Sequence, residues 1–397
     1  MTWNHRSRIA IVGIAIQPTP GTFVQPGVND LLAVSAPANA DEMISADDPT
    51  LTGGMFASPR VYLGRVGTAG ATFPLRGFSG ALPAANANVW GRILQAFGFA
   101  EIRQGADVTA EVLQAGSTTN SLVLATTRPS TDDQLIGVPI SQASLGAGFQ
   151  SYTMISDYVG ASRTAVIPET VVAPAAGAAY TIPAHLLYQL GTLATEPTLL
   201  SISVWRDKKR YDYRDCRGTT LNFDLPVANE QNQVFPSCDF ALRGNKHAVV
   251  DDPAPIVPQS QLSVGIPVLR GGKFVLDRVK LGHASIRAGL DLDVAAASNA
   301  NQAAGQDGYT TTGATRRVET DLNQMNVTDF DIDTRIDNQT LMSMFTSWGS
   351  STFNRFGFLV PEMSLDPHNP GDRNGFVNLT GAANPTQVDK SMALAVW

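Results

Sequence analysis

The sequence has little cysteine and little histidine, and each shortage excludes a class of protein. Among its 397 residues are two cysteines, Cys216 and Cys238, too few and too far apart for a disulfide scaffold or a cysteine-based zinc site. The five histidines are scattered, and none falls in an HxxxH frame. We therefore expect two reduced, buried cysteines, no metal site and no cofactor.

Charge is scarce as well. Charged residues make up 16% of the chain, and the formal net charge is −7. Proteins that grip nucleic-acid phosphates are usually basic, so this balance argues against that class. Hydrophobic residues make up 43%, which is enough for sizeable cores. A surface with so little charge suits a subunit that buries much of itself against its neighbours.

Long apolar runs are also missing. The best candidate, residues 9–16, is far shorter than the roughly 20 residues that a membrane helix needs. No small-residue cleavage site of an export signal follows it. Its alternation of Ile and Val with Ala and Gly predicts a first strand that ends at "QPTPG", residues 17–21. We therefore expect a soluble protein, made in the cytoplasm, without a membrane segment.

What the sequence does contain is period-two alternation, which is typical of strands. In residues 220–225, Leu221, Phe223 and Leu225 share one face and polar residues share the other. Residues 202–205 and 210–214 flank a polar turn and predict a hairpin, and residues 237–242 alternate again. The reactive-looking stretch "DCRGTTLNFDL", residues 215–225, is therefore interpreted as part of a sheet, with Cys216 and Arg217 at a bend between strands.

Two segments have helical spacing instead. Residues 88–97 and residues 337–348 each follow a strand-like segment, and each is followed by glycine. Asp337 or Asn338, at the start of the second segment, can cap its first turn. Their apolar stripes are the predicted helix-packing residues: Trp90, Ile93, Leu94 and Phe97 in the first, and Leu341, Phe345 and Trp348 in the second.

The order strand, polar link, helix and Gly-Phe exit occurs in both halves of the chain, which suggests a weak internal repeat. It predicts a mainly β protein with two tandem β-barrel or β-sandwich domains, each with one flanking α-helix. The first domain would comprise residues 1–114 and 184–250, and the second residues 263–397. The proline-rich residues 251–262 would link them. Residues 115–183, rich in Thr, Ser, Ala and Gly, would form a small inserted all-β module on the surface.

Acidic residues recur at alternate positions, most densely in "DFDID", residues 329–333. On a strand these carboxylates would face one way, ~6.6–7 Å apart. A calcium loop is one reading, but Thr334 and Thr340 stand where an EF-hand needs Gly and Glu. A solvated strand face is the other reading, and nothing distinguishes the carboxylates for acid–base catalysis. The candidate residues are Asp224, Asp291, Asp293, Asp329, Asp331 and Asp333.

The order of these patterns resembles the large tail tube proteins, or major tail proteins, of long-tailed, non-contractile bacteriophages (siphoviruses). The resemblance lies in "QPTPGT", "SPRVYLGRVGTAG", "LRGFSGALPAANANVWGRILQAFGF" and "RDKKRYDYRDCRGTTLNFDL" in the first half of the chain. In the second half it lies in "GGKFVLDRVKLGHASIRAGLDLDV" and "DFDIDTRIDNQTLMSMF". The inserted region, from "STTNSLVLATTRPSTDDQLIGVPI" onward, is similar to a small β module found in phage structural proteins.

The resemblance implies tail-tube-type domains and a structural virion protein without enzymatic activity. Its copies would form rings, either trimers with pseudo-six-fold symmetry or hexamers, which stack into a conduit for genomic DNA. Tail terminator, tape measure and distal tail proteins would be partners, and DNA would pass without specific binding. The acidic candidates would then face the lumen. Two long segments with little regular signal, residues 26–59 and 299–318, would be arms between rings. The alternative function is a surface adhesin with glycan-binding β-sandwiches.

Overall fold

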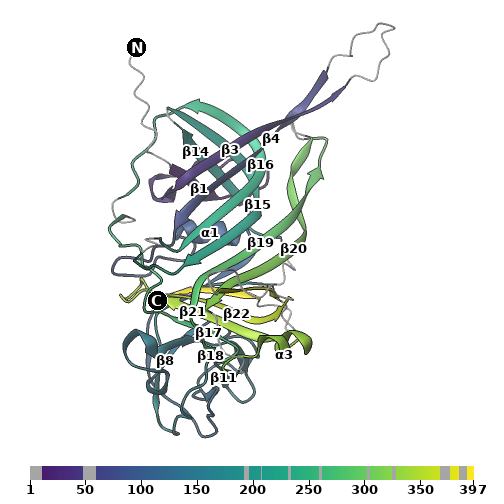
Figure 1. Cartoon of the computed structure of the whole chain (residues 1–397). Helices are drawn as coiled ribbons and strands as arrows, with labels where there is room; N and C mark the ends of the chain where they lie inside the picture. Colours follow the sequence, from purple (N-terminus) through teal and green to yellow (C-terminus); the bar gives the residue numbers. More distant parts are fainter. Residues whose placement is uncertain are drawn as a thin grey trace.

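The chain is mainly β, as predicted, in a computed structural model that describes residues 11–47, 60–191, 196–206, 208–230, 234–258, 262–301, 305–323, 328–366, 376–383 and 391–397 (Figure 1). Its strands form one large branched sheet and two small sheets. All pairings between the named strands are antiparallel. None of these sheets closes into a barrel over the described residues.

The first branch of the large sheet forms the upper body in Figure 1. Its strands are β1 (Ile11–Ile16), β2 (Leu31–Ala33), β3 (Ser35–Asp47), β4 (Arg60–Pro74), β14 (Leu200–Arg206), β15 (Lys209–Pro226) and β16 (Ser237–Asp251), and a 3-10 turn (Val28–Asp30) precedes β2. Strand β16 pairs along the whole of β15. On the other edge of β15, β14 pairs with its first half and β19 (His283–Ser298) with its second half, so the sheet divides at β15.

The second branch joins the two ends of the chain. Its strands are β5 (Phe99–Gln104), β13 (His185–Leu190), β24 (Met392–Val396), β22 (Phe356–Leu365), β21 (Met342–Trp348), β17 (Lys273–Leu276) and β18 (Val279–Lys280). The last strand, β24, lies between β13 and β22. Strands β19, β20 (Gln306–Asn323) and β23 (Phe376–Ala383) connect this branch to β15. Because one sheet and one main core include both halves of the chain, the expectation of two separate closed domains is not confirmed.

The inserted region forms two small sheets, in the lower part of Figure 1, and shares a second hydrophobic core with one face of the second branch. The strands are β6 (Val108–Val112), β12 (Ala179–Ile182), β8 (Pro139–Gln142) and β9 (Tyr152–Met154) in one sheet, and β7 (Ser121–Val123), β11 (Thr164–Val166) and β10 (Asp157–Val159) in the other; two 3-10 turns, Ala143–Leu145 and Gly148–Ser151, precede β9. Since β6 pairs with β12, this module begins before residue 115. We call residues 108–182 the inserted module.

The first predicted helix is confirmed as α1 (Val89–Gln95). It packs in the main core between the two branches, and Trp90, Ile93, Leu94 and Phe97, which follows the helix, are all buried there. Gly91 lets the helix approach β13, because a Cβ at this position would lie 2.0 Å from the hydroxyl oxygen of Tyr188. The amphipathic stripe of the sequence is therefore the face that meets the sheet.

The second predicted helix is wrong, because most of the segment is strand β21. Trp348 is buried in the main core, Phe345 is buried in the core of the inserted module, and Leu341 is 42% exposed just before the strand. Both faces of β21 are covered, so apolar residues occur on both, and their positions coincide with helical spacing. The short helix α3 (Ile332–Asp337) lies upstream instead.

The two segments with little regular signal are also corrected. Strand β3 and the start of β4 form a long hairpin, and β19 and β20 form a second one (Figure 1). Beyond residues 245 and 66, where β16 and β4 stop pairing, the described remainder of β3–β4 extends away from the sheet as a two-stranded ribbon. We call this ribbon the first arm. The second arm is the part of β19–β20 beyond Asp291 and Val318, where pairing with β15 and β23 ends.

Candidate functional site: an open sheet face and two arms

Five strands in the order β4, β16, β15, β19 and β20 present one face to the core and the other to the outside. Leu221, Phe223, Leu290 and Leu292 are buried on the inner face. Three rows of paired residues cross the outer face: Pro74–Ser237–Asp224–Arg287–Glu319, Thr72–Asp239–Asn222–Gly289–Arg317 and Gly70–Ala241–Thr220–Asp291–Thr315. We call these fifteen residues the open face. Its side chains are mostly small, polar or charged.

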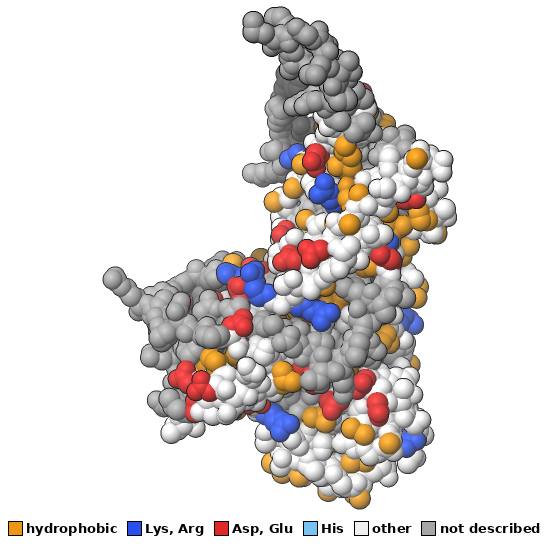
Figure 2. All heavy atoms as spheres, turned by 90° about the vertical axis from the view of Figure 1, so that its right-hand side faces the viewer, with side chains coloured by type: hydrophobic (Ala, Val, Ile, Leu, Met, Phe, Trp, Pro, Cys, Tyr) orange, Lys and Arg blue, Asp and Glu red, His pale blue; other side chains and the backbone are white. Residues whose placement is uncertain are grey.

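Charges of both signs lie on the open face, and carboxylates outnumber arginines. Asp224 lies 3.7 Å from Arg287, and Glu319 lies 3.1 Å from Arg317, both as exposed or half-exposed ion pairs. Asp239 accepts a hydrogen bond of 3.0 Å from the Thr72 hydroxyl. Figure 2, viewed from the side of the arms, likewise shows acidic and basic side chains interspersed on the molecular surface. Exposed pairs of this kind contribute about 0–1 kcal/mol to stability, so they do not explain the face as a stabilising feature.

Three of the six candidate carboxylates lie as their alternation predicts. Asp224 is exposed on β15, and Asp291 and Asp293 are exposed on β19, where they alternate with buried Leu290 and Leu292. The orientation of this face toward a channel stays a prediction.

The other three acidic residues are not on a strand, which corrects the expected row of carboxylates. Asp329 lies in a turn, Asp331 caps α3 and Asp333 lies in its first turn. The Asp331 carboxylate accepts hydrogen bonds from the backbone N–H and the hydroxyl of Thr334, at 3.0 and 2.6 Å, and these bonds lower the pKa of Asp331. Asp331 therefore caps the helix, and Asp333 is a favourable negative charge in its first turn.

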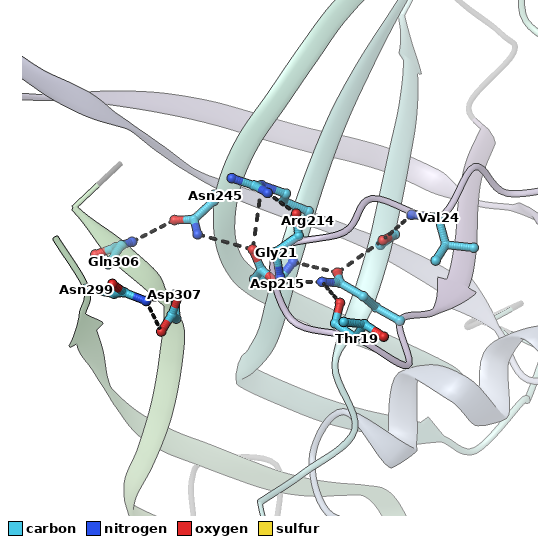
Figure 3. Close-up of polar contacts among 11 residues, drawn as sticks. Thr19, Gly21, Val24, Arg214, Asp215, Asn245, Asn299, Gln306 and Asp307 are labelled. Carbon is cyan, nitrogen blue, oxygen red and sulfur yellow. Dashed lines mark hydrogen bonds and ion pairs between the residues drawn. The ribbon is translucent and has the colours of Figure 1, made fainter. Parts of the chain in front are cut away.

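The bend at Asp215 is a buried polar cluster rather than a reactive loop (Figure 3). Asp215 has a φ of 56° at an irregularity in the β15–β16 pairing. Its carboxylate accepts hydrogen bonds from the Gln17 amide (2.5 Å), the Gly21 N–H (2.7 Å) and the Asn245 amide (3.3 Å). The Gln306 amide of β20 donates to Asn245 at 2.7 Å. We call these five residues the buried junction. It joins the QPTPG turn, β15, β16 and β20, which are far apart in the sequence.

The cysteines have no environment that would activate them. Both Cys216 and Cys238 are free and buried, as expected. Burial raises the pKa of each thiol, and the neighbouring Asp215 and Asp239 raise it further. Because the thiolate is the nucleophile, these environments oppose reactivity.

A buried ion pair lies where the inserted module meets the second branch. Lys273 of β17 lies 2.9 Å from Glu169, and both side chains are almost fully buried. The partly exposed Lys280 lies 3.4 Å from the same carboxylate, and Lys273 also donates to the Leu145 carbonyl at 3.3 Å. Burial lowers the pKa of Lys273, and the Glu169 carboxylate opposes that shift. Sequence patterns gave no sign of this pair, because its members are 104 residues apart.

Two hollows lie on the described part of the structure. One, of about 190 Å³, lies between the inserted module and the second branch, and the other, of about 270 Å³, lies beside α1. Neither is lined by histidine or cysteine. Within the described ranges there is no group of three His, Cys, Asp or Glu side chains able to hold a metal ion, and no helix long and apolar enough to cross a membrane.

Comparison with known proteins adds no family to this picture. The sequence matches no protein-family model, and a search of curated proteins found no relative.

Proposed function

We propose that the chain is a structural subunit of a phage tail tube. Copies would join through sheet edges into rings, the rings would stack through the two arms, and genomic DNA would pass along the central channel. The observation that carries the proposal is the open face, a five-stranded surface that no described part of the chain covers. Repeated around a ring, this face would form a polar wall.

The chemistry of the open face is consistent with a passage for DNA. Carboxylates such as Asp239 and Asp291 repel phosphates, whereas arginines attract them. Arg287 and Arg317 each lie beside a carboxylate on the same face, which reduces their attraction for DNA. A lining of this kind lets a polyanion slide without adhering. The exterior would then be formed by the inserted module.

The arms supply surfaces that a monomer leaves unused. Met43 and Tyr62 of the first arm are each 57% exposed. A two-stranded ribbon is only marginally stable by itself in water, so a partner surface would stabilise it. Contacts between rings provide such a surface for every copy. This supports the role of arms expected from the sequence, now assigned to hairpins instead of irregular loops.

A glycan-binding adhesin is supported less well. Exposed tryptophan rings would favour such a site, but Trp90, Trp205, Trp348 and Trp397 are all buried. Trp3 lies outside the described residues. We therefore retain tube assembly as the proposed function. The principal partner of the chain would be other copies of itself, with three or six copies in each ring.

Negative-stain microscopy and native mass spectrometry of the purified chain test this proposal. We expect rings or tubes and a mass of three or six subunits; monomers alone at every concentration would refute it. A variant with Met43→Asp and Tyr62→Asp should keep rings but lose stacking, because charge replaces the apolar contacts of the first arm. Val172→Asp, at an apolar residue of the inserted module that is even more exposed (81%), is the control and should still form tubes. Normal tubes from the double variant would exclude the first arm as the stacking contact.

A further inference from the structure

Both arms are anchored to the same short stretch of β15 and β16. The first arm departs where the pairing of Val66 with Asn245 ends. The second arm touches β16 at that same Asn245, through Gln306. Between these contacts lies Asp215, at the centre of the buried junction. The base of the first arm and the far end of the second arm therefore meet at one place on the molecule.

The anchor of the first arm is a lysine held between two aromatic rings. The ammonium of Lys246 lies 4.7 and 4.6 Å from the ring centres of Tyr211 and Tyr213, and 2.8 Å from the Asp41 carboxylate of β3. The Tyr213 hydroxyl donates to the same carboxylate at 2.7 Å. Gly67 of β4 lies directly on the Tyr213 ring, where a Cβ would come within 2.3 Å. We call Asp41, Tyr211, Tyr213 and Lys246 the tyrosine anchor.

The anchor of the second arm is formed by arginines. Arg217 of β15 donates to the Tyr309 carbonyl at 3.0 Å, and Arg243 of β16 donates to the Tyr309 hydroxyl at 3.1 Å. Arg217 is also paired with Glu196 at 3.3 Å. We call Arg217, Arg243 and Tyr309 the arginine anchor. It fixes the start of β20 against β15 and β16, the same two strands that hold the first arm.

The buried junction connects the two anchors. Asp215 lies between Tyr213 and Arg217 in the sequence of β15, and Asn245 lies between Arg243 and Lys246 in β16. The carboxylate of Asp215 is fully buried, and a buried charge left without its donors is strongly destabilising. The backbone of this bend therefore cannot shift at one anchor without straining the contacts of the other.

We propose that the buried junction is a positioning device that sets the directions of both arms and couples them. Loosening either anchor should widen the range of directions of both arms. By reciprocity, the coupling has the same free energy whichever anchor is disturbed. The inference concerns the directions of the arms within one subunit. Only its consequence rests on the proposed function: arms held in fixed directions would meet their contact sites on the next ring.

Spin-label distances measure this directly. The native cysteines are buried, so labels can be placed at Ala100→Cys of β5 with either Ser45→Cys of the first arm or Thr312→Cys of the second. Labelled protein is diluted with unlabelled protein, so that only distances within one subunit are recorded. We expect one narrow distance distribution for each pair in the otherwise unchanged chain.

Lys246→Met removes the charge from the tyrosine anchor and should abolish the narrow distribution of both label pairs. Lys246→Arg restores charge and ring contact and should recover both. Arg65→Met, which removes a charge from an exposed position on β4, is the matched control and should change neither. Unchanged distributions in Lys246→Met would overturn the inference, and broadening confined to the first arm would overturn the coupling.

Gln306→Ala tests the same positioning device from the second arm. It provides an independent test in case Lys246→Met does not fold. It should broaden the distribution at Ser45→Cys although residue 306 has no contact with the first arm in the described structure; an effect limited to Thr312→Cys contradicts the coupling. If these variants form rings and their distance distributions are unchanged, the coupling through the buried junction is refuted and the proposed function is not. If the unmodified chain forms no rings, the proposed function is refuted, whereas the result of the distance measurements remains valid.

Discussion

Two outer faces of the same sheet have opposite chemistry. On the second branch, the outer face carries Leu187, Val275, Phe345 and Leu359, and the inserted module covers it. On the first branch and its continuation into β19 and β20, the corresponding surface is the open face, with threonine, asparagine and carboxylate side chains. The chain thus provides a cover for the apolar face and none for the polar face.

The difference shows which face of the sheet the chain covers with its own residues. An uncovered apolar face of that size would be an aggregation hazard, and the module removes it. The polar face presents no such hazard, so it can remain in water or line a wet channel. The module is therefore part of the subunit's own core as well as a surface decoration, because Phe345 and Leu359 belong to the same buried cluster as Leu122 and Ile140 of the module.

The largest effect should come from opening a cavity under the module. Phe345→Ala removes a fully buried ring and should lower the free energy of unfolding by about 3–5 kcal/mol. Thr315→Ala on the open face removes an exposed side chain and should change it by less than about 0.5 kcal/mol. Urea denaturation of both variants measures the contrast. Equal losses would contradict the division into a covered and an open face.

A smaller loss should follow from breaking the ion pair beneath the module. Glu169→Gln leaves the Lys273 ammonium buried without its counter-charge and should cost about 3 kcal/mol. The same change at Glu196→Gln, whose pair with Arg217 is partly exposed, should cost about 1 kcal/mol or less. Combining Glu169→Leu with Lys273→Met should recover most of the stability. If the double variant is as unstable as Glu169→Gln, an unpaired buried charge is not the cause.

The covered face also explains which parts of the fold the sequence could predict. The second half of β15 buries one face against the main core, and the largest apolar residues of the mostly buried α1 stand at helical spacing, so local periodicity is a reliable guide for both. Strand β21 buries Trp348 on one face and Phe345 on the other, the second beneath a module encoded about 200 residues earlier. Local spacing contains no information about that cover, so a helix was predicted there.

The strands of the arms and the buried junction escaped prediction for different reasons. Strand β3 and residues 310–317 of β20 expose much of both faces, so small and polar residues occur there with little contrast between alternate positions. The junction depends on contacts such as Gln17 with Asp215, which are 198 residues apart. The sequence did indicate that residues 215–225 belong to a sheet, because the alternation of Leu221, Phe223 and Leu225 is local.

A small effect on stability, and the sharpest on function, should come from reversing charge on the open face. Asp224→Lys with Asp291→Lys should leave the free energy of unfolding within about 1 kcal/mol, because both side chains are exposed. The same variant should acquire salt-sensitive binding to duplex DNA, since each added lysine neutralises a phosphate and releases counterions. Fluorescence anisotropy with labelled DNA at two salt concentrations measures the gain.

The matched control changes the net charge equally at another place. Asp329→Lys with Asp333→Lys alters the turn before α3 and its first turn, away from the open face. If the open face is the surface that DNA passes, tubes of the open-face variant should retain DNA in their channel, and tubes of the control should bind it only outside. Equal retention by both variants would mean that total charge governs contact with DNA. Asp224 and Asp291 would then not lie closer to the passing DNA than Asp329 and Asp333 do.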